Sequence, residues 1–217
     1  MLDERIERNP RCAVATPTLF RNRIQTPALP LARMAAPRDY LIHLLTEAAE
    51  IEHNLLCSYL YAAFSLKTHD CESLNAGERE LVGAWRNSIV GVAIEEMGHL
   101  ALVNNLLVAV GGAPHFDRPN LPVPAGYHPS GFVIRLAPFT RETLEHFVFL
   151  ERPAQAKVQD PAGQYRHEGP ERGQTLGHLT PSTPDYETIG EFYDEIRRAL
   201  LAFAKACGER AFLASSQ

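Results

Sequence analysis

Apolar residues recur every three or four positions in four segments of the chain, which is the spacing of one helix face. The first two segments, 39–67 and 76–110, are long and contain no proline. Two shorter segments, 141–152 and 186–206, follow. Amphipathic helices must bury their apolar faces against one another, so the pattern predicts an all-α fold with four helices.

The second segment carries residues that start and stop helices. Asn75 followed by Glu78 fits a capping box, and Gly111 with Gly112 fits a helix end. The connections 114–139 and 154–182 lose the helical periodicity and are rich in proline, glycine and polar residues, apart from a short strand-like run in the first. We therefore predict a four-helix bundle with two long irregular crossover loops.

Acidic residues and a histidine interrupt apolar faces that should be buried. Glu52 lies within the stripe of the first helix, Glu96 and His99 share the stripe of the second, and Glu151 ends the stripe of the third. Ionised carboxylates rarely enter a core without a partner, and Glu-x-x-His is a half-site of dinuclear carboxylate bundles. The pattern predicts a metal centre built from these four residues.

Two other acidic pairs fit this centre less well. Glu50 and His53 also have the Glu-x-x-His spacing, but their helical neighbours are polar, so we predict that this pair lies at the surface. On the fourth helix Glu191 lies off the apolar stripe, and periodicity alone predicts a solvated side chain. Glu191-x-x-Asp194 is the nearest substitute for a second half-site there.

Length and composition narrow the class of protein. With 217 residues, 45% hydrophobic and 22% charged, the chain can form one domain, which we place at 39–217, preceded by an N-terminal arm at 1–38. No stretch of about 18 uncharged apolar residues predicts a membrane span, and acidic residues near the start disfavour a signal peptide, which predicts a cytoplasmic protein. A net charge of -5 gives no reason to expect a nucleic-acid partner. The cysteines form no Cys-x-x-Cys pair, are too few for a disulfide scaffold and predict buried thiols rather than ligands: Cys12, Cys57, Cys71 and Cys207.

Five motifs, in the same order along the chain, resemble the ferritin-like domain of iminophenyl-pyruvate dimer synthases from bisindole pigment pathways. The similarity covers about residues 39–205. It implies a ferritin-like four-helix bundle with metal ligands at Glu52, Glu96, His99, Glu151 and Glu191. Those enzymes are far larger chains, so the resemblance implies the bundle rather than the dimerising activity. The motifs are residues 52–62, 95–99, 104–107 with 111–114, 149–153 and 188–193.

Carboxylates and one imidazole suit iron, with manganese as the alternative, in a dinuclear site that reacts with dioxygen or a peroxide. We therefore predict a metal-dependent oxidoreductase or oxygenase acting on a small organic metabolite, aromatic or amino-acid-derived. Tyr59 lies two turns after Glu52 on the inward stripe, where it can bond a ligand or relay an electron, or simply pack in the core. The alternatives are an iron-handling protein of the ferroxidase type, which needs a cage-forming homo-oligomer, and a metal-free structural bundle.

Overall fold

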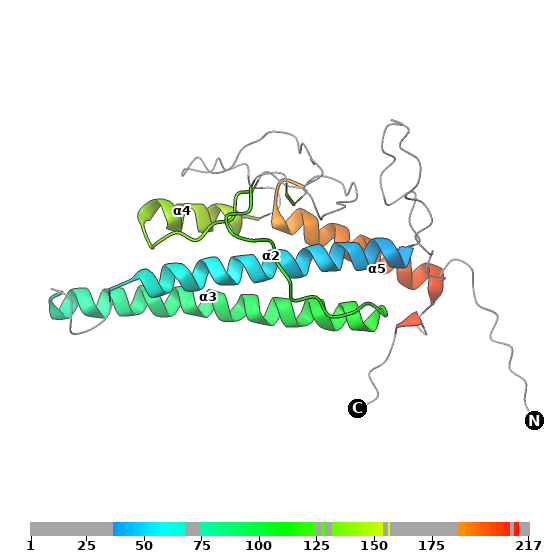
Figure 1. The fold of residues 1–217 in the computed structure, drawn as a ribbon, viewed down its shortest axis with the longest axis horizontal. Coiled ribbons are helices and arrows are strands. Elements are labelled where there is room, and N and C mark those ends of the chain that lie inside the picture. Colours follow the sequence, from blue (N-terminus) through cyan, green and yellow to red (C-terminus); the bar gives the residue numbers. More distant parts are fainter. Residues whose placement is uncertain are drawn as a thin grey trace, which may run out of the picture.

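The computed structural model describes residues 37–67, 74–124, 127–128, 132–153, 156, 186–208 and 211–212 (Figure 1). Within these ranges the regular elements are four helices, which confirms the predicted all-α fold. The observed ends differ from the predicted ones by three residues at most. The helices are α2 (Pro37–Ser65), α3 (Ala76–Ala109), α4 (Arg141–Leu150) and α5 (Ile189–Cys207).

The ends of α3 form as the sequence predicts. The Asn75 side chain accepts from the backbone N–H of Glu78 at 3.0 Å, and the Glu78 carboxylate accepts from the backbone N–H of Asn75 at 2.8 Å. At the other end Gly111 has φ 78°, and a Cβ there would lie 2.1 Å from Arg38 Nη2. Arg38 donates to the carbonyls of Val110 and Gly111, both at 2.6 Å. Glycine is therefore required at position 111, and Arg38 joins the start of α2 to the end of α3.

Helix α2 is the centre of the fold. It runs beside α3 along the length of the molecule, and α4 and α5 also pack against it (Figure 1). Apolar residues of α2 such as Leu41, Leu44 and Leu55 are almost fully buried, and Tyr59 packs edge-on against Phe147 of α4 with ring centroids 4.6 Å apart. Because neighbours cover α2 on several sides, its polar residues are also drawn into the interior.

Burial around α2 overturns one prediction. Glu50, expected at the surface with His53, is only 7% exposed. His53 is half-buried, and its Nδ1 lies 2.9 Å from the carbonyl oxygen of Phe116. The prediction was wrong because it counted neighbours on the same helix, whereas the crossover after α3 covers this face.

Helical periodicity predicts Leu144, Phe147 and Val148 as the inner face of α4, which is partly wrong. Phe147 is buried as expected, but Leu144 is 43% and Val148 is 66% exposed. His146 and Leu150 are buried in their place. A helix of ten residues offers too few turns for its own periodicity to fix which side faces the core.

The connections are described only in part. The strand-like run in the crossover contributes one antiparallel bridge between Val123 and Ile134. The predicted arm, apart from its last two residues, and nearly all of 154–182 lie outside the described residues, so the domain boundary stays a prediction. Cys57 is a free thiol as predicted, whereas Cys207 is disulfide-bonded, which contradicts the prediction for that residue.

Among the described helices, α3 has the length and composition of a membrane span. Core helices of soluble proteins meet the same criterion, and α3 packs along α2. This single helix is therefore weak evidence for a membrane protein.

Candidate metal centre

Three of the predicted ligands meet between α2 and α3. Glu52, Glu96 and His99 offer ligand atoms that all lie within 4.8 Å of one another. His99 Nδ1 is 3.3 Å from Glu52 Oε2 and 3.3 Å from Glu96 Oε2. The two glutamates are 2% and 4% exposed, while the side chain of His99 is 52% exposed. The two carboxylates are thus buried, and the imidazole lies at the solvent-exposed edge of the cluster.

Burial disfavours the charged form of both glutamates in this cluster. Burial raises the pKa of Glu52. Burial first, and then the neighbouring Glu52, raise the pKa of Glu96 to about 8. Within the described part of the chain the ion pairs of both carboxylates go to His99. Bringing two acids together in this way is costly without a cation, and a divalent ion would remove that cost.

The donor geometry fits a metal ion. Two ligands bonded at about 2.05 Å to one tetrahedral ion lie about 3.3 Å apart, which is the spacing found between His99 and each glutamate. Glu52 Oε2 is buried and accepts no hydrogen bond from the described residues. A set of carboxylates with one imidazole suits iron, manganese or zinc. The residues present therefore fit the predicted group.

Glu151 and Tyr59 border this cluster as a bonded pair. Glu151 caps the C-terminus of α4, and the buried Tyr59 hydroxyl donates to Glu151 Oε1. Desolvation and the nearby Glu96 raise the pKa of Glu151. Burial and the charge of Glu151 raise the pKa of Tyr59 well above its usual value. Tyr59 therefore remains a neutral donor at physiological pH.

Glu191 has a different environment. Its Oε2 accepts from the backbone N–H of Glu187 at 2.8 Å, and its own backbone N–H donates to Thr188 Oγ1 at 3.1 Å. Both contacts belong to the N-terminus of α5. The structure thus places Glu191 at a helix cap, outside the group of Glu52, Glu96 and His99, and its role as a ligand stays a prediction.

Glu191→Gln separates capping from metal binding, because the glutamine carbonyl can still accept from Glu187 whereas a neutral amide is a weak ligand. We expect metal affinity to fall, but by less than in Glu52→Gln, since the carboxylate must leave the helix terminus to reach an ion. Competition titration with a chelator measures both affinities. Wild-type affinity in Glu191→Gln would remove this residue from the site.

Tyr193 of α5 was missed as a site residue. Its hydroxyl donates to Glu52 Oε1, and burial together with Glu52 raises its pKa. In the sequence, Tyr193 lies on the apolar face of the fourth helix, with Phe192 and Ile196. The available signal was a tyrosine within a buried stripe, whose hydroxyl must find a partner there.

The cluster opens into a cavity of about 300 Å³, which Glu151 and Tyr193 also line. A second cavity of about 510 Å³ shares Glu151 and Arg152 with it, and a third of about 720 Å³ continues from the second. The last two lie between α3 and α4, and we call them the α3–α4 groove. Residues lining the groove include Trp85, Ser88, Ile89, Leu144 and Val148. An apolar groove of this size can hold a small organic molecule beside the carboxylates.

Comparison with known proteins shows the family of this chain. A family model described as Ferritin-like matches residues 45–215. The 2-imino-3-(indol-3-yl)propanoate dimerase of Chromobacterium violaceum is 32% identical over 127 residues, which cover 50% of this chain and 13% of that enzyme. The dichlorochromopyrrolate synthase of Lentzea aerocolonigenes is 36% identical over 94 residues, covering 36% of this chain and 9% of that enzyme. This chain thus spans only a small fraction of either relative. No solved structure matches it significantly.

Proposed function

This chain belongs to the ferritin-like family, and we propose that it is a metal-dependent oxidoreductase or oxygenase acting on a small organic molecule. The family match and the two relatives, both named as enzymes, confirm the resemblance to ferritin-like domains of the iminophenyl-pyruvate dimer synthase type. The observation that carries the proposal is the junction of a buried Glu-Glu-His cluster with the apolar α3–α4 groove through Glu151.

In this proposal Glu52, Glu96, His99 and Glu151 hold a dinuclear centre, with Glu191 as a fifth ligand. The ions are iron, with manganese as the alternative, and they supply redox chemistry with dioxygen or a peroxide as oxidant. Tyr193 fixes Glu52 by donating to Oε1, which leaves Oε2 on the side of His99. The ligand set is thereby oriented before any ion binds.

Tyr59 is the proposed catalytic residue. Its hydroxyl donates to Glu151 Oε1, and Tyr59 also lines the α3–α4 groove. The raised pKa holds the hydroxyl proton at neutral pH. The Tyr59 oxygen can therefore accept a proton from a substrate in the groove while its own hydroxyl proton passes to the Glu151 carboxylate, and the reverse transfer returns both protons.

The lining of the α3–α4 groove favours an aromatic or amino-acid-derived substrate. Trp85, Leu144 and Val148 offer apolar surface. Charged side chains line both parts of the groove, Glu151 with Arg152 in one and Arg141 with Glu145 in the other. Such a substrate would agree with the indolyl compound in the name of the first relative. The groove also favours an enzyme over iron storage, since an iron-handling protein has no use for an organic pocket. A cytoplasmic location remains part of the proposal.

Oxygen uptake tests this function. The iron-loaded protein should consume dioxygen faster when supplied with an aromatic 2-oxo acid and ammonium, or with an aromatic amino acid.

Tyr59→Phe should lower kcat at least about 100-fold with unchanged metal content, because a general acid–base group is lost. Leu144→Trp should raise KM about tenfold or more, because it fills the groove. An oxygen electrode and elemental mass spectrometry give both readouts.

Leu201→Trp is the matched control, because Leu201 is 61% exposed on α5 and does not line the groove. It should leave KM unchanged. Substrate-independent oxidation of ferrous iron together with a very large particle in light scattering would contradict the proposal and favour iron handling.

A further inference from the structure

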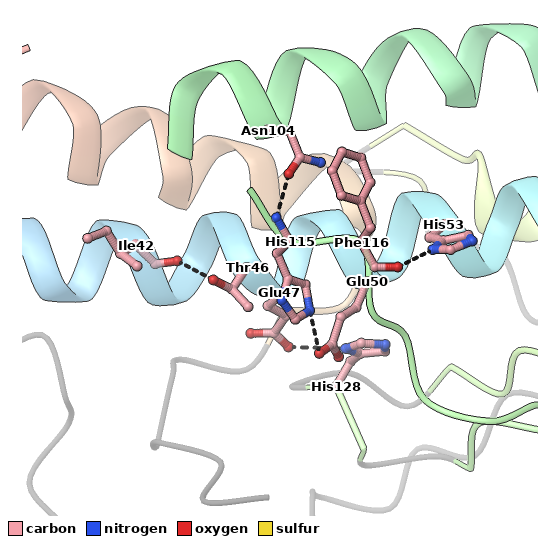
Figure 2. A network of polar contacts seen from close by, with 9 residues as sticks. All are labelled: Ile42, Thr46, Glu47, Glu50, His53, Asn104, His115, Phe116 and His128. Atoms are coloured by element: carbon pink, nitrogen blue, oxygen red, sulfur yellow. Dashed lines mark hydrogen bonds and ion pairs between the residues drawn. The ribbon is translucent and has the colours of Figure 1, made fainter. Parts of the chain in front are cut away.

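A second cluster of carboxylates and imidazoles lies on another face of α2. Glu47 and Glu50 project from α2 toward His115 and His128 of the crossover (Figure 2). Glu47 is 8%, Glu50 is 7% and His128 is 4% exposed. Position 50 lies about 200° around the helix from position 52, so this cluster is separate from the Glu52 centre.

Contacts of the crossover place its two histidines beside α2. The backbone N–H of His115 donates to Asn104 Oδ1 of α3 at 2.6 Å (Figure 2). The ring of Tyr127 packs edge-on against His128 with centroids 5.0 Å apart. The Tyr127 side chain also hydrogen-bonds to Glu50. Contacts outside the four side chains thus hold both imidazoles against α2.

The nitrogen-to-oxygen distances match those of the Glu52 centre. His115 Nε2 is 3.2 Å from Glu50 Oε1, and His128 Nδ1 is 3.4 Å from Glu47 Oε1. Neighbouring ligands of one tetrahedral ion lie about 3.3 Å apart. Both places on α2 therefore pair buried carboxylates with imidazole nitrogen, although among the described residues only Glu52, Glu96 and His99 bring three ligand atoms within 4.8 Å of one another.

Hydrogen bonding alone does not satisfy the second cluster. Glu47 Oε2 and His128 Nε2 are buried and have no hydrogen-bond partner among the described residues. Two carboxylates one turn apart in the interior are costly when both are ionised. A bound cation would offset that charge and give Glu47 Oε2 a partner.

We propose that Glu47, Glu50, His115 and His128 form a second metal site that takes one divalent transition-metal ion of the zinc type. Two imidazoles and two carboxylates are ligands that zinc accepts in tetrahedral sites. In the structure the four side chains form two separate pairs. Binding of the ion would move the two pairs together so that all four side chains coordinate it. The site ties the crossover to α2 and is independent of the oxidoreductase function.

Zinc titration of the metal-free protein tests this site, with a chromophoric chelator as competitor. His115→Gln with His128→Gln should lower the zinc stoichiometry by one ion per chain. The Glu52→Ala protein should keep that ion, and cobalt(II) added to it should give the intense visible absorption of tetrahedral coordination. His53→Gln is the matched control, because this histidine of α2 bonds the Phe116 carbonyl and not the cluster. It should bind zinc as the wild type does.

Unchanged zinc stoichiometry in the double histidine variant would overturn the proposal, as would a Glu52→Ala protein that binds no zinc or gives no tetrahedral cobalt spectrum. Circular dichroism checks that each variant folds. If the double variant does not fold, Glu47→Gln replaces it, since the amide keeps the shape of the side chain and should lower zinc affinity at least tenfold. A wild-type protein that binds zinc at the second site but no metal at the Glu52 centre would count against the proposed function and leave the second site standing.

Discussion

Glu52→Ala and Glu96→Ala should each lower metal affinity at least about 100-fold, so that protein purified without chelators contains almost no iron or manganese. The wild type should carry about two ions per chain, as dinuclear carboxylate bundles do. Both carboxylates are buried against His99 and have no other ion-pair partner among the described residues, so removing either one breaks the ligand set. Elemental mass spectrometry gives the stoichiometry directly.

Glu95→Ala is the matched control for these variants. Glu95 precedes Glu96 in α3 but is exposed, so its removal changes the same local charge without touching the cluster. It should retain the wild-type metal content. A wild-type metal content in Glu52→Ala or Glu96→Ala would show that the ligand set is wrong. A wild type that takes up no metal, even after anaerobic addition of ferrous iron, would leave the bundle as a scaffold.

The metal-free protein should lose stability as the pH rises from about 5 to about 8, by a few kcal/mol. The pKa of Glu96 is about 8 in the folded protein and 4.5 ordinarily, so in this window the folded chain binds a proton that the unfolded chain has released. The stabilisation by this proton is complete below pH 4.5 and is lost as the pH passes through about 8. The raised pKa values of Glu52 and Glu151 act in the same direction.

Urea unfolding in the presence of a chelator, at about pH 5 and about pH 8, measures this loss. Glu96→Gln should flatten the dependence, because the amide does not titrate, whereas Glu95→Gln should keep it. Metal affinity should follow the opposite trend and rise with pH, since the carboxylates must lose their protons to bind. Stability of the metal-free protein that increases toward pH 8 would contradict the raised pKa values.

Local rules in the sequence were sufficient to predict where the helices lie along the chain. The Asn75 capping box and Gly111 set the ends of α3 through contacts between residues close in the chain or through backbone conformation. The periodicity of long helices also predicted that Glu52 and Glu96 are buried. Over many turns the apolar stripe defines the buried face even where a single polar residue interrupts it. Prediction became weaker for α4, where ten residues could not fix the buried side.

The sequence by itself determined the four helices, the all-α class and the inward positions of Glu52 and Glu96. Only the tertiary structure decided which groups from separate elements meet: Tyr193 with Glu52, Tyr59 with Glu151, and the buried Glu47 and Glu50 with the crossover histidines. Helical periodicity depends on bonds between residues four apart, so it can be read along the chain. Contacts between segments depend on how loops return and which faces they cover, and no local pattern encodes that path.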